Sequence, residues 1–88
     1  MKVFYNDVPL EELIESKVDS KIYSYLKCIQ KVVKHIEYDD EGNGINVIDE
    51  GRNKPITVFM HPMSEEIRTL ALQAIKENDC SKYLPNID

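Results

Sequence analysis

Cysteine is scarce in this chain, which has only two among its 88 residues, Cys28 and Cys80. Two cysteines so far apart do not make the disulfide framework of a small secreted domain, and they lack the C-x-x-C spacing of redox and zinc motifs. We therefore expect reduced thiols. A tetrahedral zinc site would also need His35 and His61, and no two of these four residues have the spacing of a zinc finger, so no metal site is predicted.

Long apolar segments are also lacking. The longest apolar runs, such as residues 56–60, are far too short for a bilayer-spanning helix. The first residues do not form the apolar region of a signal peptide. We predict a cytoplasmic protein with no membrane partner.

The motifs of common enzyme classes are missing. The sequence has no G-x-S-x-G, no P-loop and no dinucleotide-binding glycine pattern. The presence of two cysteines and two histidines does not by itself indicate a catalytic cysteine–histidine pair, because nucleophilic catalysis also needs a third group that orients the base. We predict no catalytic residue and no cofactor.

The composition is that of one folded unit, with 42% hydrophobic and 31% charged residues. At this length the core is near the lower limit for a domain that folds alone. A homodimer, which would add stability, is left open. We expect a single domain over residues 1–78 and an irregular polar tail over 79–88.

The N-terminal half predicts a strand followed by helices. Residues 2–5 are β-prone, Asn6-Asp7 suits a turn, and the apolar positions 10, 13 and 14 predict a helix over 8–16. A second helix follows over 19–34, with Asp19 or Ser20 as its cap, and the sequence leaves open whether the two helices are separate. Its apolar residues fall in an arc of about 120° when a helix turns by 100° per residue. They are Val18, Ile22, Tyr25, Leu26, Ile29, Val32, Val33 and Ile36.

The C-terminal half predicts strands and one more helix. β-prone runs at 35–40, 45–50 and 55–61 are separated by turn signals, of which Asn43-Gly44 is the strongest. Ser64 caps a final helix with acidic residues in its first turn. The fold class is therefore α+β: a small antiparallel sheet of three to four strands with two to three helices on one face, in the order β-α-(α)-β-β-β-α. The predicted core contains Val18, Ile22, Leu26, Ile29, Val33, Ile67, Leu70 and Ile75.

Charge is unevenly distributed along the chain, although the net charge is −5. Five lysines, at positions 17, 21, 27, 31 and 34, fall opposite the apolar side of the second helix. Six of the sixteen acidic residues gather in the following segment, which contains no basic residue between 37 and 51. They are Glu37, Asp39, Asp40, Glu41, Asp49 and Glu50.

The acidic segment resembles an EF-hand calcium loop when Asp39 is read as its first position. Asp39, Asn43, Gly44 and Glu50 match the loop pattern. Glu41, Asn46 and the Gly51 to Pro55 stretch depart from it, so a solvated acidic hairpin is favoured over a metal site. The resemblance implies calcium ligands at Asp39, Glu41, Asn43, the Ile45 carbonyl and Glu50.

These features favour a small acidic, non-enzymatic protein-binding regulator, inhibitor or adaptor. The six carboxylates would steer its association with a protein that has a basic surface. A nucleic-acid-binding module that uses the five lysines, with Tyr23 beside them, is an alternative, although the net charge makes nucleic acid the less favoured partner. A small enzyme subunit and a calcium-binding module are further alternatives.

Overall fold

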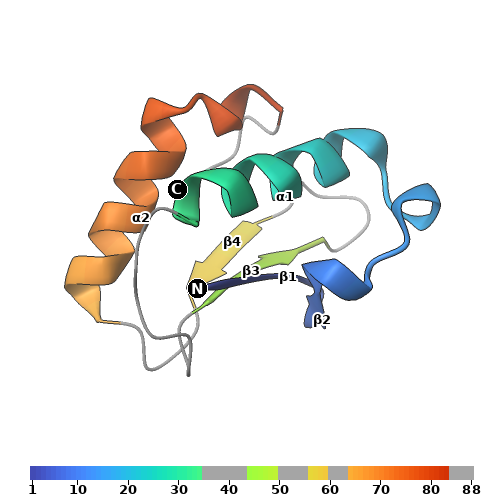
Figure 1. Ribbon diagram of the computed structural model, residues 1–88, viewed down its shortest axis with the longest axis horizontal. Coiled ribbons are helices and arrows are strands. Elements are labelled where there is room, and N and C mark those ends of the chain that lie inside the picture. Colours follow the sequence, from blue (N-terminus) through green and yellow to red (C-terminus); the bar gives the residue numbers. More distant parts are fainter. Residues whose placement is uncertain (35–43, 50–55, 60–63, 84–88) are drawn as a thin grey trace.

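The computed structural model describes residues 1–34, 44–49, 56–59 and 64–83. Along the chain lie β1 (Lys2–Tyr5), β2 (Val8–Pro9), η1 (Leu10–Glu12), η2 (Glu15–Lys17), α1 (Ser20–Val33), β3 (Gly44–Ile48), β4 (Ile56–Phe59), α2 (Glu65–Glu77) and η3 (Cys80–Lys82). The η elements are short 3-10 turns. Figure 1 shows α1 lying over one face of the sheet, with its C-terminal end meeting α2. The α+β class is confirmed.

The sheet has the strand order β2-β1-β3-β4 and is mixed. β1 pairs parallel with β3, whereas the β1·β2 and β3·β4 pairs are antiparallel. The prediction of a wholly antiparallel sheet is therefore wrong. Its physical reason is the crossover: α1 carries the chain back along the sheet between β1 and β3, so the two strands run in the same direction.

The predicted turn at Asn6-Asp7 is confirmed and joins β1 to β2. Both residues have positive φ, 47° and 70°, which asparagine and aspartate tolerate better than most residues. The turn is bonded to β3 and the residue after it. Asp7 N donates to Asn46 Oδ1 at 3.1 Å, and Asp49 N donates to Asn6 Oδ1 at 2.9 Å. The buried Asn46 also donates from Nδ2 to Asp7 Oδ1 at 3.0 Å, so both polar atoms of its side chain have a partner.

The predicted helix over 8–16 is wrong. The chain forms β2, then η1 and η2, with extended backbone at Leu13 and Ile14 between the two turns. Leu10 is buried, but Ile14 is 56% exposed, so the apolar positions do not share one buried side. The extended backbone at Leu13 and Ile14 also separates this segment from α1.

α1 begins where Asp19 accepts hydrogen bonds from the backbone N–H groups of Lys21 and Ile22. This cap satisfies donors that have no partner within the helix. The predicted apolar side is buried from Ile22 to Val33, and Leu26 and Ile29 are fully enclosed. Val18 is half-buried, and Ile36 lies outside the described residues.

α2 has the predicted cap, because Ser64 Oγ accepts a hydrogen bond from Ile67 N. Ile67, Ala71 and Ile75 are its buried residues. Leu70, which we placed in the core, is 46% exposed. At 100° per residue Leu70 lies about 100° from the centre of the buried stripe, so the helix turns it towards solvent.

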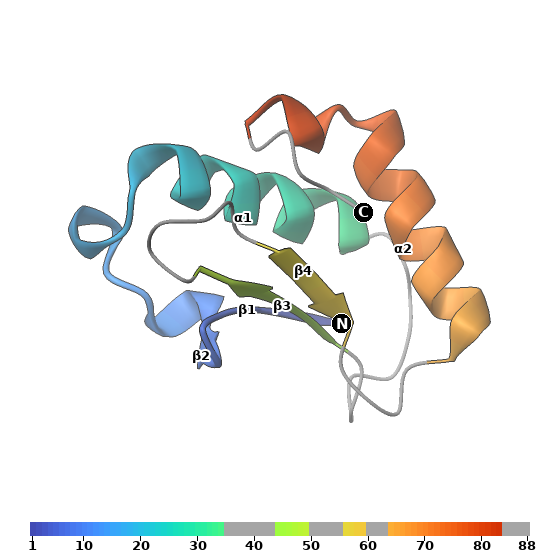
Figure 2. The ribbon, with the colours of Figure 1, turned by 180° about the vertical axis from the view of Figure 1, so that it is seen from behind.

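The core lies between the sheet and the helices, whose arrangement Figure 2 shows from behind. Val3, Ile45 and Val47 face it from the two central strands. Within the described residues, the predicted strands at 45–50 and 55–61 are confirmed as β3 and β4. The predicted strand at 35–40 lies outside the described residues.

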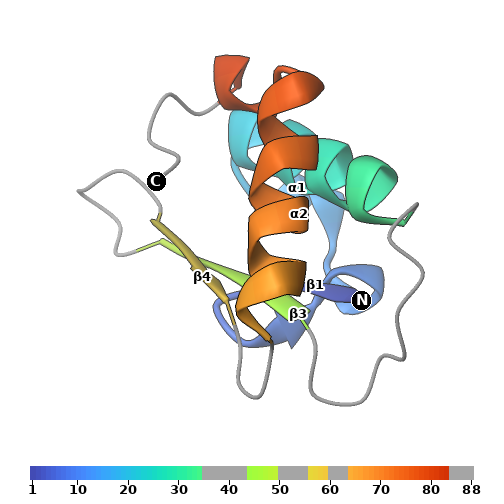
Figure 3. The same cartoon turned by 90° about the vertical axis from the view of Figure 1, so that its left-hand side faces the viewer.

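Cys28 and Cys80 form a disulfide that ties η3 to the middle of α1, with a Cα–Cα distance of 5.7 Å. The prediction of reduced thiols is therefore wrong. A separation of 52 residues in the sequence gave no sign that the end of α2 folds back over α1, which the side view in Figure 3 makes visible. Cys80 is fully buried although it follows the predicted end of the domain at residue 78. The division of the chain into a domain over 1–78 and a tail over 79–88 stays a prediction.

Candidate binding surface

The exposed side of α1 carries a row of lysines. Lys27, Lys31 and Lys34 are exposed and lie at i, i+4 and i+7, so their Cα atoms lie along one side of the helix. Together with Gln30 and Met1 they line a hollow of about 700 Å³. We call this hollow the lysine groove. Lys17, in η2, and Lys21, in the first turn of α1, do not line it.

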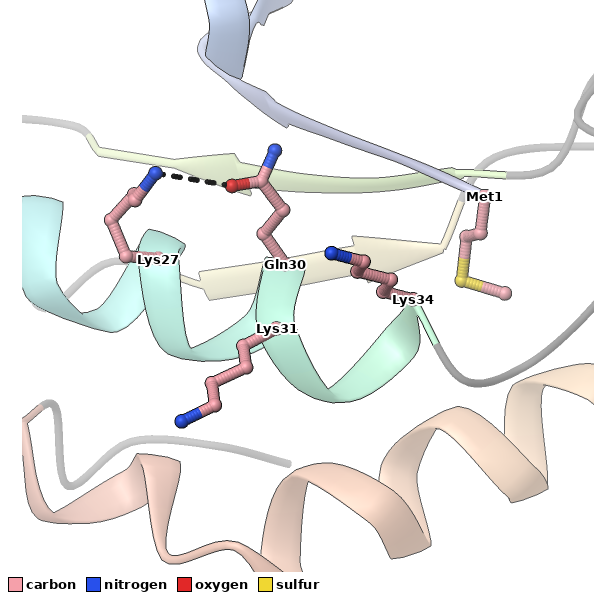
Figure 4. A pocket seen from close by; sticks show the side chains of 5 residues that line it. All are labelled: Met1, Lys27, Gln30, Lys31 and Lys34. Atoms are coloured by element: carbon pink, nitrogen blue, oxygen red, sulfur yellow. Dashed lines mark hydrogen bonds between the residues drawn. The ribbon is translucent and has the colours of Figure 1, made fainter.

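None of the described residues that line the groove is acidic. Lys27 Nζ donates to Gln30 Oε1 at 3.4 Å, a long contact that leaves the ammonium free to turn to a stronger acceptor. Figure 4 shows the Lys27, Gln30 and Lys34 side chains on one side of the helix and Lys31 pointing the other way. The groove thus presents two cations on one side and a third on its border.

A second groove, of about 430 Å³, lies on the Lys31 side of α1. It runs between α1 and the segment after α2, and we call it the tyrosine groove. Its lining includes Tyr23, Lys27, Cys28, Lys31, Asn78 and Tyr83. Lys27 and Lys31 therefore border both grooves. The sequence pointed to Tyr23 but not to Tyr83, because residues 79–88 were read as a tail. The disulfide and the packing of η3 against α1 bring Tyr83 to this groove.

Five of the six predicted partner-binding carboxylates, Glu37, Asp39, Asp40, Glu41 and Glu50, lie outside the described residues. The sixth, Asp49, accepts a hydrogen bond of 2.9 Å from the Tyr5 hydroxyl. Burial, followed by this bond and the charge of Asp49, raises the pKa of Tyr5 to about 12. Asp49 therefore helps to hold β1 against the end of β3.

The EF-hand resemblance finds no support in the described part of the segment. Ile45 lies within β3, in register with Val3 on one side and Phe59 on the other. β4 occupies the stretch in which an exit helix would run. The other four implied ligands, Asp39, Glu41, Asn43 and Glu50, lie outside the described residues.

The possible zinc ligands are not available as a set, because Cys28 and Cys80 are bonded to each other. Within residues 1–34, 44–49, 56–59 and 64–83, no three histidine, cysteine or carboxylate side chains are grouped to hold a metal. In the same ranges, no helix has the length and apolar character needed to cross a membrane. Comparison with known protein families, curated proteins and solved structures finds no match for the chain.

Proposed function

We propose that this protein is a small non-enzymatic binding protein whose lysine groove takes the phosphate backbone of a nucleic acid. The observation that carries the proposal is that Lys27 and Lys34 face one hollow with Lys31 on its border, and that none of the described residues lining this hollow is acidic. Sequence reasoning ranked nucleic acid below a protein partner because of the net charge of −5. Charges farther away than a Debye length, about 8 Å at physiological salt, are largely screened, so a negative net charge does not by itself exclude binding of phosphate to a local cluster of lysines.

The spacing of the three lysines suits a row of phosphates. Seven residues of helix separate Lys27 from Lys34, which corresponds to a rise of roughly 10 Å. Successive phosphates of one duplex strand are spaced by about 3.4 Å along the axis, so two or three of them lie within that span. Binding through three lysines should be weak and should depend strongly on salt, because each phosphate contact releases counterions.

Fluorescence anisotropy with a labelled twelve-nucleotide single strand at low salt tests this proposal. We expect K27Q/K31Q/K34Q to lower the affinity at least tenfold and to flatten the salt dependence, which for three contacts has a slope of about −2 on logarithmic axes. K17Q/K21Q is the matched control, because it removes exposed lysines outside the groove. Equal losses in the two variants, or an unchanged affinity in the first, would contradict the proposal.

The acidic segment as the binding site for a basic protein partner stays a second proposal. Only Asp49 of its six carboxylates is described, and it is engaged with Tyr5, so no contact in the described residues favours this function. Its test is kinetic: D39N/D40N/E41Q should lower the association rate with such a partner and leave the melting temperature nearly unchanged, because exposed charges contribute little to stability.

The cytoplasmic location is likewise a proposal, and the disulfide argues against it. Disulfides persist in oxidising compartments, whereas those inside cells are chiefly redox-sensing bonds or belong to hyperthermophiles. Alkylation of thiols at the moment of lysis, followed by mass spectrometry, shows whether Cys28 and Cys80 are bonded in the native cell.

A further inference from the structure

The tyrosine groove adjoins the lysine groove, and the two share their border. Lys27 and Lys31 line both hollows. A chain whose phosphates follow the lysines therefore passes the mouth of a groove that has an aromatic ring on each wall. Tyr23 belongs to α1, and Tyr83 follows η3.

Both rings have features of a stacking platform. Tyr83 is 36% exposed, and Lys82 Nζ lies 5.3 Å from the centre of its ring. A cation on one face of a ring leaves the other face available to a base and adds positive charge near the phosphates. Tyr23 is half-buried and packs against the core, so its position is fixed before any ligand arrives.

The disulfide gives the wall formed by Tyr83 a fixed place. Cys28 itself lines the groove, and its partner Cys80 stands three residues before Tyr83. Tyr83 N donates to the Cys80 carbonyl at 3.1 Å, which continues the turn from the disulfide to the ring. A preformed wall lowers the entropy lost when a ligand binds.

We infer that the tyrosine groove accepts an unpaired nucleobase by stacking, so that the ligand is single-stranded nucleic acid. This inference rests on the proposed function, since the lysine groove must hold the neighbouring phosphates. A duplex keeps its bases stacked on one another and offers none to the groove. An exposed aromatic side chain beside a cationic track is how single strands are bound without strong sequence preference.

Three probes of equal length separate the base from the phosphate: oligo-dT, a fully abasic single strand, and a duplex. Each is labelled and titrated by anisotropy against the intact, oxidised protein. We expect oligo-dT to bind roughly tenfold more tightly than the abasic strand, because the free energy of stacking one base on an aromatic side chain corresponds to about that change in affinity. Tyr83→Ala should remove this difference without changing the affinity for the abasic strand. Tyr83→Phe, which keeps the ring, should retain it.

The outcomes distinguish this inference from the proposed function. Equal affinities for oligo-dT and the abasic strand, tighter binding of the duplex, or an unaffected Tyr83→Ala variant would overturn the stacking site. Binding of the abasic strand that still depends on Lys27, Lys31 and Lys34 would then leave the proposed function standing. Failure of all three probes to bind would overturn both.

Discussion

Opening the disulfide between Cys28 and Cys80 should strongly destabilise the protein. The bond closes a loop with a sequence separation of 52 residues. The chain-entropy relation for a loop of that length gives about 4 kcal/mol of free energy of unfolding. A small domain has a total of roughly 5–15 kcal/mol, so the bond supplies a large share. For a domain of this size, each kcal/mol corresponds to roughly 4–8 °C, and we expect the melting temperature to fall by about 15–30 °C.

The assay is thermal unfolding followed by circular dichroism, with and without a phosphine reductant. The matched control is C28S/C80S, which should melt near the reduced parent and be insensitive to the reductant. Both cysteines must be replaced, because a single substitution leaves a reactive thiol. If thiol counting shows complete reduction and the melting temperature falls by less than about 5 °C, the bond does not constrain the unfolded chain as the loop-entropy argument requires.

Two further predictions concern the core and an alkaline titration. Leu26→Ala should lower the free energy of unfolding by about 2–5 kcal/mol in urea titration because Leu26 is fully buried, whereas Leu70→Ala should change it by under about 0.5 kcal/mol. Similar losses of free energy in the two variants would show that the buried sides assigned to α1 and α2 are wrong. The pKa of Tyr5 is raised from 10.0 to about 12, so its contribution is complete below pH 10 and lost as the pH rises to 12. The free energy of unfolding of Tyr5→Phe should therefore fall less steeply with pH across that interval than that of the parent. Identical dependence on pH in the two proteins would contradict the Tyr5–Asp49 contact.

The sequence predicted the elements that have a strong local signal. Asp19 and Ser64 both cap helices, and the period of apolar residues located the buried side of α1. Local signals failed where tertiary context decides. Residues 10–14 have an apolar spacing that suits a helix. Leu10 is buried and Leu13 packs against the core, but Ile14 is exposed, and the chain stays in short turns.

The other source of error was contacts between residues far apart in the sequence. The direction of β1 relative to β3 depends on the crossover by α1, and the disulfide depends on how η3 returns to that helix. The five lysines were predicted as one side of a helix, but only three of them share a groove, because Lys17 lies before α1 and Lys21 lies at its start. Tyr83 could not be found from the sequence, since nothing local predicts that residues 79–83 lie against α1.

The most direct test of the lysine groove as the working surface is a two-dimensional ¹H–¹⁵N NMR titration of the oxidised protein with an oligo-dT strand at low salt. The largest shifts are expected in the backbone amides of residues 27–34 and 78–83, which border the two grooves. Those of Ile56 and Val58, whose exposed side chains lie on β4, should stay in place. Shifts centred on β4 or on residues 44–49, or an unchanged spectrum at saturating strand, would contradict the proposal.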